Sequence, residues 1–498
     1  MNFSFAGMNT LADPAGIPLK NGQCVDIVNC WLNDEHQATV RDGFVRVQTG
    51  SFTSAWSPDP SGAYVVKEGH LYWFNGSTLA NCTQTINGTL GYVALGNIVE
   101  FTSVNGMTVF SDGAYIGIAD GTMVTRMDDA GQWDLVAATG GLDDWVLHHY
   151  PDSLESGTSN FEVDAFKLPV LPGKCLTFFS GALYLARGNF VFCSKTFDVS
   201  HMDIRYHVAA GFSAPVTMIA AMNDGLYVGT EDAVYFLAGG GLTADGEGAS
   251  GEFIQKKVAE VGAMANTLVM VGQTLVPLVQ AVEPVALWST PLGVFCGTTG
   301  GIVHNLSQDK VIFPVTGTIL PRGSAQFRDT DGIYQYLVSF QGHGWVMNSN
   351  TLTFSRYTGW DFAGQFALPS GYYGVSALGL YRLAGNKDFY GEAGEKTVAA
   401  TIVTPVTDFG VAQKKSLDLA SLYGRFHGEA VLDLLCDETE AFTGLIFPDP
   451  HAIGMLRVRG KPPKGIAGSS WQFRIRNVAG SRFTLQGLEL STIKRSRR

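Results

Sequence analysis

A short unit of strand, turn and strand recurs along this sequence, and the repeat limits the folds that the chain can adopt. Its best-formed copy is residues 222–237, where Asn-Asp-Gly precedes the run Leu-Tyr-Val-Gly and Glu-Asp precedes Ala-Val-Tyr-Phe. Gly, Asn and Asp between β-branched and aromatic runs are the usual signals of β-hairpins. Related copies have first strands that begin at Leu71, Thr108, Leu183, Leu226, Val294 and Tyr336.

The spacing of these copies points to a particular architecture. Successive copies are separated by 37, 75, 43, 68 and 42 residues. Three of these separations match the ~40–50-residue period of propeller blades, and the two long ones fit a blade with an insertion or a degenerate blade. We therefore predict an all-β fold: a β-propeller of about six blades, degenerate ones included, with a small C-terminal β-sandwich-like domain. A chain of two or three β-sandwich domains is the structural alternative.

Changes in the repeat pattern and in strand length along the sequence suggest the domain limits. We expect residues 1–50 to be an N-terminal docking segment that closes the propeller, and residues 51–370 to be the propeller itself. The polar stretch 128–173 interrupts the repeat and is typical of a long insertion, where partner contacts often lie. From residue 371 to 498 we expect a C-terminal β-rich domain with a basic tail, because runs such as 471–476 and 482–490 alternate apolar and polar residues over longer strands.

Charge is low and unevenly distributed. Charged residues make up 16% of the chain and the net charge is −12, which argues against tight binding to phosphate backbones. Residues 451–498 carry eleven Lys or Arg and one acid, a local charge of +10, so the preceding residues carry −22. The basic end is either a docking feature for an acidic partner or a solvated strand and tail. Its candidate docking residues are Arg474, Arg476, Lys494, Arg495, Arg497 and Arg498.

Motifs for catalysis, cofactors or metals are missing from the sequence. It contains no P-loop, no dinucleotide-binding glycine motif, no H-E-x-x-H and no G-x-S-x-G. His148-His149 would point to opposite faces of a strand, and Asp245, Glu247 and Glu252 lack the spacing of a calcium loop. The seven cysteines are scattered without C-x-x-C, as expected for reduced, mostly buried thiols. We expect no enzyme activity, no cofactor and no metal.

Two features of the sequence bear on secretion and membrane insertion. The N-terminus has neither the basic region nor the apolar core of a signal peptide. The most apolar window, residues 261–288, is interrupted by proline, glutamine, asparagine and glutamate, so we expect no membrane span.

Both ends of the chain carry distinctive short segments. At the start, these are residues 7–10 (Gly-Met-Asn-Thr), 13–14, 17–19, 22, 25–33 with Asn29, and 41–44 (Arg-Asp-Gly-Phe). At the end, they are residues 468–476 (Gly-Ser-Ser-Trp-Gln-Phe-Arg-Ile-Arg), 483–489 and the basic terminus. In these segments, about 90 residues in all, the chain resembles the tail nozzle, or tail tubular protein B-like, β-propeller family of tailed bacteriophages.

The resemblance implies a structural role in a virion. It implies a homo-hexameric ring that extends the tail tube, docks against an adaptor or tube protein above, contacts tail fibres or tail-tip proteins, and lets phage DNA pass through its lumen without specific binding. The chain would be made in the host bacterial cytoplasm and end in the virion tail. Two alternatives remain: a propeller enzyme or lectin acting on a host surface glycan, and a baseplate or distal-tail protein of a long-tailed phage.

Overall fold

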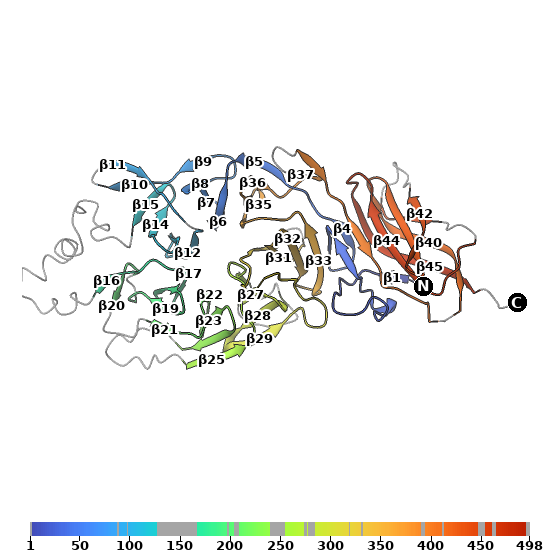
Figure 1. Ribbon diagram of the computed structural model, residues 1–498. Helices are drawn as coiled ribbons and strands as arrows, with labels where there is room; N and C mark the ends of the chain where they lie inside the picture. The colour runs from blue at the N-terminus through green and yellow to red at the C-terminus, as the bar shows by residue number, and fades with distance from the viewer. Residues whose placement is uncertain are drawn as a thin grey trace, which may run out of the picture.

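The computed structural model describes residues 2–86, 89–96, 98–126, 167–196, 199–203, 209–239, 254–272, 276, 284–317, 319–329, 332–389, 394–410, 413–446, 454–460 and 465–494. These residues form β-strands and a few 3-10 turns, η1 (Leu19–Asn21) and η4 (Thr299–Gly301) among them. A propeller and a β-sandwich lie side by side, and the first and last strands, Asn2–Ser4 and Phe483–Lys494, pair in one sheet of the sandwich (Figure 1).

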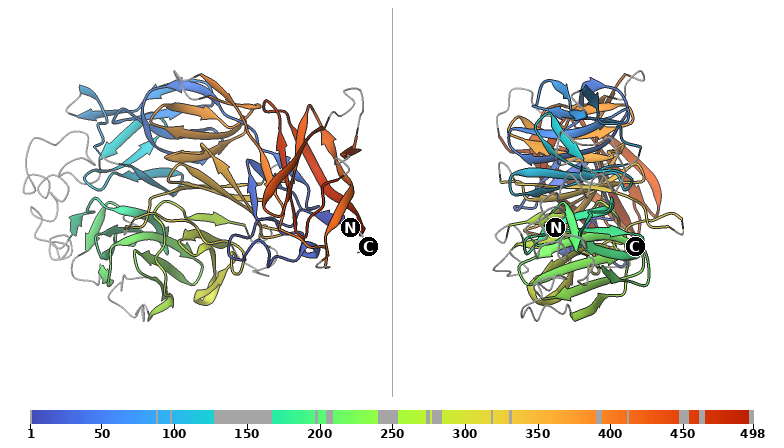
Figure 2. Two further views of the ribbon diagram at one scale, coloured as in Figure 1. Left: turned by 45° about the vertical axis from the view of Figure 1, so that its right-hand side comes forward. Right: turned by 90° about the vertical axis from the view of Figure 1, so that its left-hand side faces the viewer.

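Seven antiparallel sheets, each built on four strands, form the propeller (Figure 2). Blade 1 contains β6 (Phe52–Asp59), β7 (Gly62–Lys67), β8 (His70–Phe74) and β9 (Leu79–Asn81). Blade 2 contains β12 (Glu100–Val104), β13 (Met107–Ser111), β14 (Ile116–Asp120) and β15 (Met123–Arg126), extended by β10 (Thr83–Ile86) and β11 (Thr89–Tyr92). Blade 3 contains β17 (Lys174–Phe179), β18 (Ala182–Arg187), β19 (Phe190–Cys193) and β21 (Ala209–Gly211).

The remaining blades complete the ring. Blade 4 contains β22 (Val216–Met222), β23 (Gly225–Thr230), β24 (Val234–Ala238) and β25 (Ile254–Ala259). Blade 5 contains β26 (Val269–Val271), β27 (Val285–Thr290), β28 (Gly293–Thr298) and β29 (Ile302–Asn305). Blade 6 contains β30 (Ser324–Arg328), β31 (Gln335–Phe340), β32 (His343–Asn348) and β33 (Thr353–Thr358). Blade 7 contains β34 (Gly364–Leu368), β35 (Gly371–Ser376), β36 (Gly379–Arg382) and β5 (Val45–Thr49). The predicted all-β propeller is confirmed, but it has seven blades where about six were expected, because the blade that closes the ring takes its fourth strand from residues 45–49.

Local sequence explains the blades. Tight turns join neighbouring strands, and in Asn105-Gly106 and Ser180-Gly181 both central residues have positive φ, as the hairpin turn with matching twist requires. Neighbouring blades cover both faces of the middle strands, so every residue of β23, β27 and β31 is buried. Because both faces of these strands are buried, their sequences do not alternate between apolar and polar residues.

The ring closes with a strand from the start of the chain. β5 pairs with β36, so residues near the N-terminus complete the last blade. Blade 7 then packs on blade 1 through one apolar cluster, in which the rings of Phe74 and Tyr373 meet edge to face at 5.4 Å. Blade 7 extends to Arg382, past the domain limit expected at residue 370.

The sandwich combines both ends of the chain. One sheet has the order β3 (Cys30–Leu32), β4 (Ala38–Val40), β45 (Phe483–Lys494), β40 (Lys415–Phe426) and β43 (Leu456–Gly460), with β1 (Asn2–Ser4) on β45. The other has the order β2 (Asp26–Val28), β39 (Thr401–Val403), β44 (Trp471–Asn477), β41 (Ala430–Cys436) and β42 (Thr439–Ile446). Apolar side chains of the two sheets share one core. Of residues 1–50, therefore, β1 to β4 belong to the sandwich and β5 to the propeller.

The two domains share a sheet. β2 pairs in parallel with β33 of blade 6, so blade 6 and the second sandwich sheet form one continuous sheet of nine strands. Two small ribbons complete the fold, β16 (Lys167–Pro169) with β20 (His201–Asp203) and β37 (Lys387–Phe389) with β38 (Glu395–Thr397). Most of the expected insertion at 128–173 lies outside the described residues.

Candidate functional site

The predicted docking arginines of β44 bind a buried carboxylate within the chain. Arg474 Nε and Arg476 Nε each donate to Asp433 Oδ2 at 2.7 Å, and Arg476 Nη2 donates to Oδ1 at 3.0 Å. The Asp433 side chain is fully buried, while those of Arg474 and Arg476 are 32% and 41% exposed. Each guanidinium group therefore binds Asp433 on one side and is exposed to solvent on the other.

Asp433 depends on these contacts for its charge. Burial alone would raise its pKa, but hydrogen bonds from Arg476, Arg474 and Thr443 outweigh burial and keep the pKa below its usual value. Of the other predicted docking residues, Lys494 is the last residue of β45 and lies opposite Lys415 in the strand pairing of β45 with β40. Arg495, Arg497 and Arg498 lie outside the described residues. The same is true of the residues considered as metal ligands, His148, His149, Asp245, Glu247 and Glu252.

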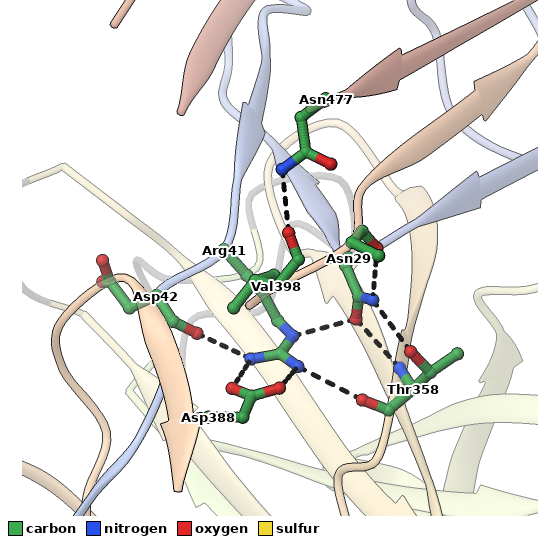
Figure 3. A network of polar contacts seen from close by, with 8 residues as sticks. Asn29, Arg41, Asp42, Thr358, Asp388, Val398 and Asn477 are labelled. Carbon is green, nitrogen blue, oxygen red and sulfur yellow. Dashed lines mark hydrogen bonds and ion pairs between the residues drawn. The ribbon is translucent and has the colours of Figure 1, made fainter. Parts of the chain in front are cut away.

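A buried arginine lies where the propeller meets the sandwich (Figure 3). Arg41 is 1% exposed and its five N–H donors all have acceptors. Nη1 and Nη2 bind the two carboxylate oxygens of Asp388 at 2.8 and 2.6 Å. Nε donates to Asn29 Oδ1 at 2.9 Å, Nη1 also to the Asp42 carbonyl at 2.8 Å, and Nη2 also to the Thr358 carbonyl at 3.2 Å. The guanidinium carbon lies 5.1 Å from the ring centre of Trp360, a cation–π distance.

Asn29 extends this network into both domains. Its Oδ1 also accepts the Thr358 N–H of blade 6 at 2.9 Å. Its Nδ2 donates to Thr358 Oγ1 at 2.8 Å and to the Ala399 carbonyl of the sandwich at 2.7 Å. The backbone of Asn29 is left-handed, with φ of 55°, a conformation that asparagine tolerates better than most residues. One side chain thus uses all its hydrogen-bonding groups to fix the junction.

The two residues after Arg41-Asp42 pack the same junction. A Cβ on Gly43 would lie 2.0 Å from the Lys387 carbonyl oxygen, so only glycine fits. Phe44 meets the rings of Trp360, Phe362 and Tyr381 edge to face at 5.3 to 6.1 Å.

Residues near the C-terminal end of the chain hold the same sandwich sheet. Asn477 Nδ2 donates to the Val398 carbonyl at 2.8 Å, and its Oδ1 accepts the Ala400 N–H at 2.8 Å. Trp471 is 1% exposed in the core, and Gly468 leaves room for Cys436 Sγ, which a Cβ would approach to 2.1 Å. Asn29 and Arg41 belong to the N-terminal segments of the resemblance, but no local sequence signal predicts that they join one ionic network.

A small cavity lies on the propeller axis. It has a volume of about 210 Å³ and is lined by residues of the first strands of several blades, among them Trp56, Glu100, Cys175 and Gln365. Glu100 accepts a hydrogen bond from the Cys175 N–H and lies 3.5 Å from Arg322 Nη2 of blade 6. Glu100 is the one acidic residue among the described lining residues, so they hold no pair of carboxylates of the kind that glycosidases use.

Other reactive groups are buried or dispersed. All seven cysteines are free, and all but Cys175 are buried. Burial raises the pKa of Cys82, Cys193 and Cys296 to about 12, so these thiols are unreactive at neutral pH. Within the described ranges, His, Cys, Asp and Glu nowhere gather in threes that could hold a metal ion. No helical segment in that part of the chain is long and apolar enough to cross a membrane.

No family model and no curated protein matches the sequence. Among solved structures, the extracellular domain of a hybrid two-component system from B. thetaiotaomicron aligns with 69% of this chain at 10% identity and a TM-score of 0.41, and the chain covers 39% of that protein. PorZ, a bacterial surface component of the type-IX secretion system of Porphyromonas gingivalis, aligns with 72% at 11% identity and a TM-score of 0.36, with 42% of its length covered. The computationally designed protein Ika8 aligns with 69% at 10% identity and a TM-score of 0.35, with 99% of its length covered. Similarity this low assigns neither a family nor a function.

Proposed function

We propose that this chain is a structural, non-catalytic protein of a phage tail, and that copies of it assemble into the nozzle ring through which DNA leaves. The observation that carries the proposal is the position of the family-like residues. Asn29, Arg41 and Phe44 from the start of the chain meet the propeller and the sandwich at one junction, and Trp471 from the end lies in the core of the same sandwich. Residues from the two ends of the chain thus stabilise the same part of the fold.

This arrangement supports a rigid two-domain subunit. The nine-stranded sheet runs from blade 6 into the sandwich, and the buried Arg41–Asp388 pair lies beside it. Fixed domain geometry is what a closed ring needs, since small changes of angle between subunits would prevent closure. We infer that the ring contains six copies, as the resemblance implies, and that an adaptor or tube protein above and fibres or tip proteins would dock on it.

The passage for DNA would lie between copies of the chain. The axial cavity of one propeller, about 210 Å³, cannot admit a duplex whose major groove alone is about 12 Å wide. The acidic body, with −22 before residue 451, would repel DNA and so limit adhesion in the lumen. The basic end would then serve contacts with acidic surfaces of neighbours.

Assembly and location test the proposal together. Light scattering of the purified chain at micromolar concentration should give the mass of a six-copy ring, and imaging should give six-fold symmetry. Mass spectrometry of purified particles of the encoding phage should detect the chain, and cryo-imaging should place it at the end of the tail. A monomer that is also absent from the particles would refute the proposal. Release of reducing ends from capsular polysaccharide would instead favour the glycan enzyme, and a position in the baseplate of a long tail would favour the distal-tail protein.

A further inference from the structure

The outer face of one sandwich sheet carries a group of arginines. In this sheet β43 pairs with β40 so that Arg457 lies opposite Tyr423, and Arg459 follows two residues further along β43. Val458, between the two arginines, packs against the sandwich core, so Arg457 and Arg459 point away from the core. Arg425 lies two residues after Tyr423 on β40 and is exposed as well. Tyr423 and the three arginines therefore share one surface, which we call the arginine face.

Only part of the charge on the arginine face is neutralised within the described chain. Glu489 of β45 accepts a hydrogen bond from the Tyr423 hydroxyl at 2.7 Å and forms an ion pair with Arg457. The guanidinium carbon of Arg457 also lies 5.4 Å from the centre of the Tyr423 ring, a cation–π distance. For Arg425 and Arg459 the described residues provide no ion pair. Together the three arginines and Glu489 have a charge of +2.

The residue types on this face are those that protein interfaces favour. Arginine, tyrosine and methionine are enriched where proteins meet, and Met455, two residues before Arg457, is 44% exposed. Complementary charge selects the partner and steers it toward such a face. The arginine face therefore fits a partner whose contact segment is acidic.

The chain itself contains an acidic segment of this kind. Residues 127–166 hold nine Asp or Glu and no Lys or Arg, a local charge of −9. The segment lies outside the described residues, but the strands at its two ends are described. β15 ends at Arg126 in blade 2, and β16 begins at Lys167 beside blade 3. Both strands lie at the end of the propeller that is far from the sandwich (Figures 1 and 2).

We propose that the arginine face binds the acidic segment 127–166 of a neighbouring copy of this chain. Carboxylates of the segment would pair with Arg425 and Arg459, which the described chain leaves without ion pairs. Because the face and the segment belong to opposite ends of the molecule, the contact is head to tail, and repeated head-to-tail contacts close into a ring when the rotation permits. The inference rests on the proposed ring and names the contact that builds it.

Two variants of the full chain each remove one half of the contact. Arg425→Glu with Arg459→Glu reverses the charge of the arginine face. The second variant neutralises part of the acidic segment and carries Asp128→Asn, Asp129→Asn, Asp143→Asn and Asp144→Asn. In light scattering at micromolar concentration, the native chain should have the mass of the ring and each variant the mass of one copy. An equimolar mixture of the two variants should form pairs, because the first keeps an intact segment and the second an intact face.

The matched control changes the net charge by the same amount on the propeller. Arg382→Glu with Lys256→Glu, at exposed positions of blades 7 and 4, should leave the ring intact. Loss of the ring in this control would show that net charge governs assembly, and would overturn the proposed contact.

The outcomes separate this contact from the ring itself. If the native chain forms rings and the reversed face still assembles, or the mixed variants stay monomeric, the contact is wrong and the ring proposal stands. A monomeric native chain overturns both. If circular dichroism shows that the variant with the reversed face does not fold, the variant of the acidic segment decides alone, and a ring of native mass in that variant overturns the contact.

Discussion

The network around Arg41 should set the stability of the propeller–sandwich junction. Arg41→Met removes a guanidinium that is 1% exposed and takes two charged hydrogen bonds away from the carboxylate of Asp388, which is 5% exposed. Breaking a buried ion pair by removing one partner costs about 3–5 kcal/mol, because the other charge stays buried. At about 1.4 kcal/mol per factor of ten, protection against local opening should fall by about two to four orders of magnitude.

Hydrogen exchange is the appropriate assay, because a chain with two domains need not unfold in one step. The Asn29 amide bonds to the Arg356 carbonyl and the Arg41 amide to the Asn29 carbonyl, at 2.8 and 2.9 Å, so peptides spanning residues 26–32 and 38–44 report opening of the junction.

A matched control lies at the same junction. Arg356 of β33 binds Asp26 of β2 with two hydrogen bonds of 2.8 and 2.6 Å, but these side chains are 34% and 25% exposed. Arg356→Met should therefore cost about 1 kcal/mol or less, a factor of ten at most in protection. Equal losses in Arg41→Met and Arg356→Met would refute the argument that burial gives Arg41 its importance.

A double-mutant cycle separates the ion pair from the packing of Arg41. Arg41→Met with Asp388→Leu leaves no unpaired charge, so the double variant should be more stable than the sum of the single effects predicts, by about 1 kcal/mol or more. Additivity within about 0.5 kcal/mol would contradict the ion-pair explanation.

Two further predictions concern the sandwich. Asp437 accepts hydrogen bonds from the backbone N–H and hydroxyl groups of Ser470 and Ser469, which lower its pKa to about 2. Because this pKa lies below the unfolded value of about 4, the contribution is complete above about pH 4 and is lost as the pH falls toward 2. The melting temperature should fall over that interval, and Asp437→Asn should flatten the fall; an identical pH profile in the variant contradicts this. Arg474→Gln should cost under about 1 kcal/mol, because Arg476 still binds both oxygens of Asp433. In the double variant Arg474→Gln with Arg476→Gln, the free energy of opening that hydrogen exchange measures for β41 should fall by more than the sum of the two single losses. Strict additivity of these losses would show that the arginines act independently.

The hairpin pattern was enough to predict the propeller, but not the strand register within each blade. Thr108, Leu183 and Leu226 lie on the second strands of their blades, whereas Leu71 and Val294 lie on third strands, β8 and β28. Second and third strands are both buried runs bounded by turns, so local sequence cannot tell them apart. Mixing them made the spacing look less regular.

Blade 7 and the junction were missed for a related reason. The fourth strand of blade 7, β5, comes from residues 45–49, so no local repeat contains the whole blade. Arg41 and Asp388 are likewise separated by 347 residues. A lone arginine before Asp-Gly-Phe is compatible with an exposed turn, and it is buried by residues far along the chain, among them Asp388 and Trp360.

The ion pairs of β44 change where docking should be sought. Because Arg474 and Arg476 already neutralise Asp433, their charge is only partly available to a partner. Strand β43 lies at the edge of the other sandwich sheet, at the opposite end of the strand order from β3, which approaches the propeller. It exposes Arg457, which pairs with Glu489, and Arg459, for which the described structure records no ion pair. Exposed arginines on an edge strand also discourage indiscriminate strand pairing. If the basic end docks on an acidic neighbour, Arg459 on this edge is therefore a better candidate within the described residues than the arginines that the sequence pattern favoured.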